Sequence, residues 1–211
     1  RFADLAKAPV VMIAKDGQFT WWQWLKARHG FRDEQLKPYN YNLGPFLANK
    51  QAIQQGYSVA EPIYVENQCR FKPVVHLLAD HGFSTYSTVI EARTETVKSK
   101  PDLVQRFVDA SAIGWVNYLY GNRQAANALM IKDNPEMSEA ELEASTALMK
   151  QQGIVDSGES LTGGIGAMSE GRIKDFYSAP MRAAAASRDP LAELREGLPA
   201  AFAKWSPLNK A

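Results

Sequence analysis

The segment Asp16-Gly17-Gln18-Phe19-Thr20 is the strongest local candidate for a binding site, because it joins an apolar strand-like run to a helix-like run. The first N–H groups of a helix have no partner within the helix, so they can bind an anion or a polar ligand group. Gly17 permits the close approach of such a ligand. From spacing alone, an ordinary turn in which Thr20 or Asp16 caps the helix is the more frequent outcome.

Three tryptophans follow on the same helix-like run. Trp21, Trp22 and Trp24 cannot all point to one side, since consecutive positions on a helix diverge by about 100°. An indole that stays exposed can stack on a flat ligand, so Trp21 and Trp22 are candidate lining residues. Packing of these rings against a sheet or a second domain is at least as frequent.

An acidic candidate lies further along the chain. Segment 55–62 places Glu61 directly before Pro62, at the expected start of a helix and at the edge where a strand-like run ends. In that position Glu61 could accept hydrogen bonds from a ligand amine. The alternative is a carboxylate that only complements the helix dipole, a common surface role worth about 1 kcal/mol or less.

The other reactive side chains form no catalytic or metal-binding motif. Cys69 is the single cysteine, and His29, His76 and His81 show no metal-ligand spacing. The glycine-rich run 163–166 lacks the Lys-Ser/Thr of a phosphate-binding loop. The sequence therefore favours a binding protein, without cofactor or metal, over an enzyme.

Charge and hydropathy exclude two further classes. The formal charge is +1, from 24 basic and 23 acidic residues that are scattered along the chain, so nucleic acid is not an expected partner. No apolar run approaches the roughly 20 residues of a membrane span. The start at Arg1-Phe2-Ala3-Asp4 is not that of a signal peptide, and we expect a processed or truncated piece of a soluble protein.

Strands and helices must position the candidate residues. The β-branched run 9–14 predicts a strand, and the amphipathic run 19–29 before Gly30 predicts a helix. We further expect a strand over 35–41, a short helix over 49–55, and strands over 72–78 and 85–90.

From Pro101 the pattern becomes helical. Apolar residues at helical spacing predict a long helix from Pro101 to Gly121, a second over 122–132, and a third opened by the capping box of Ser138 and Glu141. Ser169 is expected to cap a helix through Tyr177, with one or two further helices between residues 183 and 205. The fold class is therefore α/β, a lobe with a largely parallel sheet plus a helix-rich C-terminal part.

In this order the residues resemble a known family, the solute-binding proteins of ABC importers that take up thiamine-pyrimidine precursors, nitrate or alkanesulfonates. The resemblance covers about Asp4 to Tyr177, with the pyrimidine-precursor group as the nearest match. It rests on four segments, which are 10–29, 51–57 followed by Glu61-Pro62, 77–83 followed by Tyr86-Ser87-Thr88, and 100–110.

The resemblance implies a periplasmic-binding-protein fold, with two α/β lobes that close around a solute. Residues 1–98 correspond to the second lobe with its crossing strands, and residues 99–211 to a helical region that packs on the first lobe. Because most of the first lobe has no counterpart here, we expect exposed apolar surface and a possible homo-oligomer. The part from Ser178 fits the family poorly.

The resemblance also implies which residues of this sequence face the ligand cleft. We add Trp21 to them, because an exposed indole can stack on a flat ligand. An aminopyrimidine would pair with Glu61, whereas an anionic solute would prefer the helix start and be repelled by that carboxylate. The expected ligand-binding residues are Gly17, Gln18, Phe19, Trp21, Ser58, Glu61 and Tyr86.

The function implied is capture of a small organic solute for delivery to the membrane subunits of an ABC importer, in the periplasm or another extracytoplasmic compartment. Two alternatives remain open. One is a pyrimidine-synthesis enzyme of the same fold, which would need a cofactor-holding lysine and histidine. The other is a truncated interaction or oligomerisation module that binds no solute.

Overall fold

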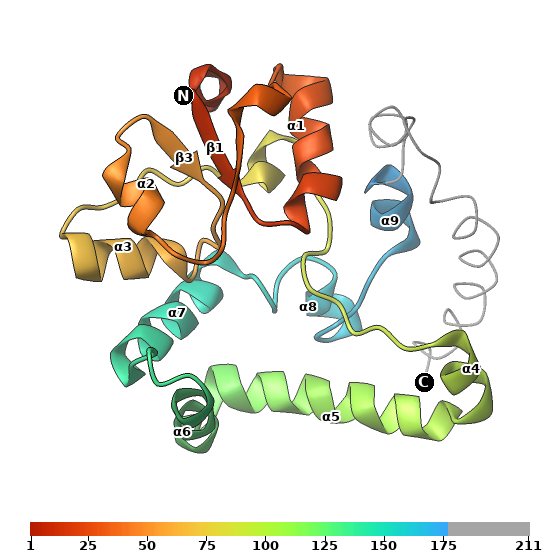
Figure 1. The fold of residues 1–211 in the computed structure, drawn as a ribbon. Coiled ribbons are helices and arrows are strands. Elements are labelled where there is room, and N and C mark those ends of the chain that lie inside the picture. Colours follow the sequence, from red (N-terminus) through yellow and green to blue (C-terminus); the bar gives the residue numbers. More distant parts are fainter. Residues whose placement is uncertain (177–211) are drawn as a thin grey trace. The chain divides into compact units, whose positions relative to one another are not determined.

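The computed structural model describes residues 1–176 of the chain (Figure 1). These residues form two compact units. Of these residues, the first unit contains 1–58, 74–85 and 170–176, and the second contains 59–73 and 86–169. The assignment of 1–98 and 99–211 to different lobes of a binding protein stays a prediction.

The first unit is built on a three-stranded parallel sheet. β1 (Val10–Ile13) lies between β2 (Leu36–Pro38) and β3 (Ala52–Gln54), so the strand order is β2-β1-β3. Val11 pairs with Leu36 on one side and with Ile53 on the other. The expectation of an α/β fold with a parallel sheet is confirmed.

β1 is the central strand because its side chains are buried on both faces of the sheet. Val11 and Ile13, which are 3% and 0% exposed, belong to a cluster with Phe2, Trp22, Trp24, Leu25 and Phe31. Met12 and Ala14 point to the other face and pack with Tyr39 and Ala52. A continuous apolar run is what a strand buried on both faces requires.

Helix α1 (Trp21–His29) covers one face of the sheet and ends as predicted. Gly30 follows it with φ of 74°, a left-handed conformation that glycine adopts without strain. Figure 1 shows α1 beside β1, in red and orange. The short 3-10 helices of this unit are η1 (Phe2–Lys7), η2 (Gly17–Phe19), η3 (Asp33–Gln35) and η4 (Leu78–His81).

Three expected elements of the N-terminal half are wrong. The stretch predicted as a helix over 49–55 contains β3, and the short helix is α2 (Gly44–Ala48), just before it. Segments 72–78 and 85–90 form no strand, although their β-branched residues favoured one. Neither segment finds a strand to pair with among the described residues.

The second unit is helical, and its predicted helices are confirmed. α5 runs from Pro101 to Tyr120, and α7 begins after the capping box in which Ser138 and Glu141 bond each other's backbone N–H groups. α7 spans Glu139–Gln152, and the other helices of this unit are α3 (Glu61–Cys69), α4 (Thr94–Ser99), α6 (Gln124–Asp133) and α8 (Ser160–Gly163).

Helix α9 (Glu170–Phe176) begins directly after Ser169, where a helix was expected, and belongs to the first unit. The helices predicted between residues 183 and 205 lie outside the described residues. None of the helices within residues 1–176 combines the length and the hydropathy needed to cross a membrane.

A buried polar network joins α5, α6 and α7. Asn127 is 0% exposed; its Nδ2 donates to Glu139 at 2.8 Å, and its Oδ1 accepts from Tyr118 at 3.0 Å. Arg123 makes two 2.7 Å hydrogen bonds to the carboxylate of Glu143. Because every partner is satisfied, the network fixes the packing of these helices rather than providing a reactive group.

Candidate functional site

The carboxyl ends of the three parallel strands meet at one edge of the sheet. β1 leads into Ala14 and the η2 turn, β2 leads into Tyr39, and β3 leads into Gln55. The side chain of Gln55 crosses this edge, since its Oε1 accepts a 2.8 Å hydrogen bond from the N–H of Ala14. In open α/β sheets this edge is where ligands bind.

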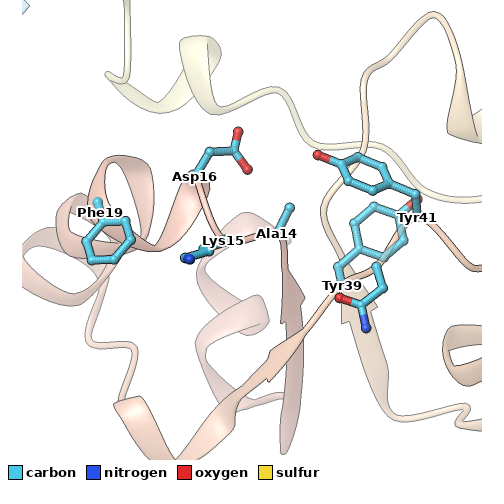
Figure 2. Close-up of a pocket in the computed structure, with 7 residues that line it drawn as sticks. Ala14, Lys15, Asp16, Phe19, Tyr39 and Tyr41 are labelled. Atoms are coloured by element: carbon cyan, nitrogen blue, oxygen red, sulfur yellow. The ribbon is translucent and has the colours of Figure 1, made fainter.

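An open hollow of about 690 Å³ lies at this edge. Figure 2 shows side chains from the end of β1 on one side of it and tyrosines from the end of β2 on the other. Its volume is within the roughly 300–1,000 Å³ of small-molecule sites. It is lined by Ala14, Lys15, Asp16, Phe19, Tyr39, Asn40 and Tyr41.

Two tyrosines form the wall that follows β2. Tyr39 is buried, with 5% of its surface exposed, and the ring of Tyr41 lies 5.2 Å from it at an angle of 48°. Tyr41 is 70% exposed and has φ of 58°. A positive φ is uncommon for a bulky residue, and such strained positions cluster at ligand-binding sites.

The opposite wall combines an aromatic ring with charges. Phe19 lies at the end of η2 and is 73% exposed. Lys15 and Asp16 are exposed side chains of opposite charge at the end of β1. This arrangement can bind a flat ring between aromatic side chains and provide both donors and acceptors for its polar groups.

Gly17 and Trp21 lie next to this hollow in direct contact with each other. A Cβ on Gly17 would come within 2.6 Å of the indole of Trp21, so only glycine fits beneath this ring. Trp21 is half-buried and packs against the core cluster. Trp22 is a core residue at 1% exposure, and its Nε1 donates to Asp33, so Trp22 does not line a site.

Backbone N–H groups of the η2 turn form hydrogen bonds within the turn itself. The N–H groups of Gln18 and Phe19 donate to the carbonyl groups of Lys15 and Asp16. The side chain of Gln18 donates to the carbonyl of Ile13 at 3.3 Å. Neither Thr20 nor Asp16 caps a helix through its side chain.

The remaining predicted residues lie elsewhere in the chain. Ser58 is the last residue of the first unit before α3, and Glu61 is the first residue of α3 in the second unit. The hydroxyl of Tyr86, also in the second unit, donates to the carboxylate of Glu159 and accepts from the N–H of Ser169 at 2.8 Å. The binding role of all seven expected residues stays a prediction.

Sequence reasoning missed the residues that follow β2. Tyr39, Asn40 and Tyr41 form no motif, and only the pairing of β2 beside β1 places them at the edge. Gln54 was also missed. Its Oε1 is buried without a hydrogen-bond partner, and strand alternation places it on the sheet face of Ala52 and Met12.

Metal binding has no support among the described residues. Within residues 1–176 no three His, Cys, Asp or Glu side chains are grouped so that they could hold an ion. The histidines instead surround Phe2, with ring centroids 5.0 Å (His29), 6.0 Å (His76) and 3.7 Å (His81) from it.

A parallel sheet with a hollow beyond its strand ends is the architecture of a ligand-binding α/β domain. Residues 23–126, about half of the chain, match the family model described as NMT1/THI5 like, and this segment belongs to that family of periplasmic solute-binding proteins. No curated protein and no solved structure matches the chain significantly. Family membership indicates a solute-binding role; members are mostly binding proteins and are typically extracytoplasmic.

Proposed function

We propose that this protein binds a small organic solute in the hollow at the carboxyl edge of its sheet and delivers the solute to an ABC importer. The observation that carries the proposal is the position of the hollow, where the ends of β1 and β2 bring Phe19, Tyr39 and Tyr41 together. Exposed aromatic rings around a concave surface are unfavourable without a partner, and a ligand would cover them.

The proposed solute has a flat, conjugated ring, such as an aminopyrimidine. Aromatic side chains bind such rings by stacking, which contributes about 0.5–1.5 kcal/mol beyond the burial of area. Tyr41 supplies a largely exposed face, and Phe19 supplies another from the opposite wall. Asn40, Lys15 and Asp16 would then select the ring substituents by hydrogen bonding.

An anionic solute has less support than a neutral or amine-bearing one. The N–H groups of Gln18 and Phe19, which would bind an anion at a helix start, are bonded within the η2 turn. Asp16 adds a negative charge at the same place. Lys15 is the lining residue that favours an anion. The Lys15→Ala variant therefore tests whether the solute is anionic.

We further propose that the protein acts without catalysis in an extracytoplasmic compartment. Family membership supports both parts. The enzymatic alternative needs a lysine and a histidine at the site, and the hollow is lined by Lys15 but by no histidine among the described residues. The yellow absorbance of a Schiff-base cofactor in the purified protein would favour the enzyme.

The experiment is a thermal-shift screen of the chain with aminopyrimidines, aromatic carboxylates, alkanesulfonates and nitrate. A solute present at 100 times its dissociation constant stabilises the folded state by about 2.7 kcal/mol. We expect the aminopyrimidines to raise the melting temperature of the wild type, and Tyr41→Ala to reduce the rise. A screen without any shift would contradict the proposal. Glu61→Ala in the same screen tests the contribution predicted for that carboxylate.

A further inference from the structure

All three histidines of the chain lie in one cluster of aromatic rings in the first unit. His81 stacks on Phe2 at 3.7 Å with an interplanar angle of 12°, and His29 meets the edge of the same ring at 5.0 Å. His76 and His81 are 6.1 Å apart. Histidine is the side chain whose charge changes between about pH 5 and 8.

This cluster attaches the 74–85 segment, here called the strap, to the body of the first unit. The strap carries η4, His76 and His81, whereas Phe2 and His29 belong to η1 and α1. Leu78 and Phe83 of the strap also pack against the core cluster. Apart from Phe83, whose ring lies 5.3 Å from that of Trp24, the aromatic contacts of the strap are made by histidines.

His29 is poorly placed to carry a positive charge. Its Nε2 is buried without a hydrogen-bond partner, and its ring lies 4.6 Å from that of Trp24. Burial lowers the pKa of His29, and His81 and Arg28 lower it further. The folded state therefore holds His29 neutral, and stability is lost as the pH falls below the ordinary histidine value toward the lowered one.

Several charged groups on the surrounding elements have hydrogen-bond or ion-pair partners of their own. Asp4 of η1 is bound to Lys7 at 2.7 Å, and Lys26 of α1 is bound to Asp33 at 2.8 Å. Arg172 of α9 donates to the carbonyl of Thr85 at the end of the strap. The charged residues of η1, α1, the strap and α9, with Arg1 before η1, are Arg1, Asp4, Lys7, Lys26, Arg28, Asp80, Glu170, Arg172, Lys174 and Asp175.

We propose that the strap is released by acid: protonation of His29 detaches the strap from η1 and α1 while the sheet stays folded. A positive charge on His29 would then be buried without a hydrogen-bond partner, in a ring cluster that joins the strap to η1 and α1. The chain passes between the two units at both ends of the strap, at residues 73/74 and 85/86.

The test is amide hydrogen exchange of the whole chain at about pH 7.5 and about pH 5.5, corrected for the intrinsic pH dependence of exchange. The strap reports through the N–H groups of Asp80, Gly82 and Phe83, which are bonded within it. Their protection should fall on the order of tenfold at the lower pH, because a buried positive charge without a partner is unfavourable. Protection of β1 should stay unchanged.

Equal protection of the strap at the two pH values would overturn the proposal, as would a parallel loss in β1, because that pattern is acid unfolding of the whole unit. A His29→Gln/His81→Gln double variant should keep its strap protection at the lower pH. The wild-type comparison stands by itself if this variant folds poorly. An unchanged acid effect in a folded double variant would also contradict acid release of the strap.

Discussion

The backbone N–H of Ala14 donates a 2.8 Å hydrogen bond to Oε1 of Gln55, which joins the end of β1 to the end of β3. Ala14 is 2% exposed, so this N–H has no access to water. The neighbouring Gln54 has the opposite property, because its own Oε1 is buried without a partner. These two adjacent glutamines at the end of β3 therefore differ in what their side chains contribute to the stability of the fold.

Gln55→Leu is therefore expected to destabilise the protein and Gln54→Leu is not. The first change leaves a buried N–H unpaired, which costs about 1–3 kcal/mol, and the second removes an unpaired carbonyl and adds apolar contact. Urea unfolding followed by circular dichroism measures both free energies of unfolding. Equal effects of the two substitutions would contradict the described roles of the glutamines.

Gly17→Ala is expected to destabilise the protein by about 1–3 kcal/mol. The added methyl group would come within 2.6 Å of the indole of Trp21, which is packed against the core and cannot move away freely. The matched control is Gly114→Ala in the middle of α5, where a Cβ meets nothing within 4 Å.

Alanine at position 114 is expected to stabilise by about 0.5–1 kcal/mol, because glycine weakens a helix interior. Thermal unfolding of both variants checks the pair. A neutral Gly17→Ala variant with unchanged tryptophan fluorescence would show that the ring does not rest on this glycine.

Stability at acidic pH should depend on Glu143. Arg123, by hydrogen bonding, holds the pKa of Glu143 below its ordinary value of 4.5. A carboxylate with a lowered folded pKa stabilises the protein above that ordinary value, and the stabilisation is lost as the pH falls through the folded value. Glu143→Gln should be less stable than the wild type at neutral pH and should approach it in acid.

The control for this prediction is Glu136→Gln, at an exposed position before α7. This variant should follow the wild-type dependence of stability on pH. Urea midpoints at a series of pH values supply the measurement. Parallel curves for Glu143→Gln and the wild type would mean that the ion pair with Arg123 adds nothing to stability.

The sequence predicted those elements whose signals are local. The run 9–14, Gly30 after α1, Pro101 at the start of α5 and the Ser138–Glu141 box each mark an element by nearby residues alone, and the structure has all four. These local signals can be identified without information from distant parts of the chain.

The elements predicted wrongly are ones whose outcome depends on a partner strand. β3 has three residues, Ala52, Ile53 and Gln54, and two of them favour strands no more than helices. It forms because it pairs with β1. The β-branched residues of 72–78 have no strand beside them among residues 1–176, so their propensity did not produce a strand.

The same reason explains why the sequence indicated only part of the lining of the hollow. Phe19 was expected from the strand-turn-helix pattern and lines the hollow. Tyr39 and Tyr41 could not be identified, because their place at the edge follows from the non-local pairing of β2 with β1. The family match indicates solute binding but names no solute.

The most direct test of solute binding in the hollow is isothermal titration of the best solute from the thermal-shift screen into two matched variants. Phe19→Ala removes a ring that is 73% exposed at the hollow, and Phe107→Ala removes one that is 59% exposed on α5. Loss of a stacking ring should weaken binding by about three- to tenfold. The account predicts that loss for Phe19→Ala alone; equal affinity of both variants and the wild type would contradict it.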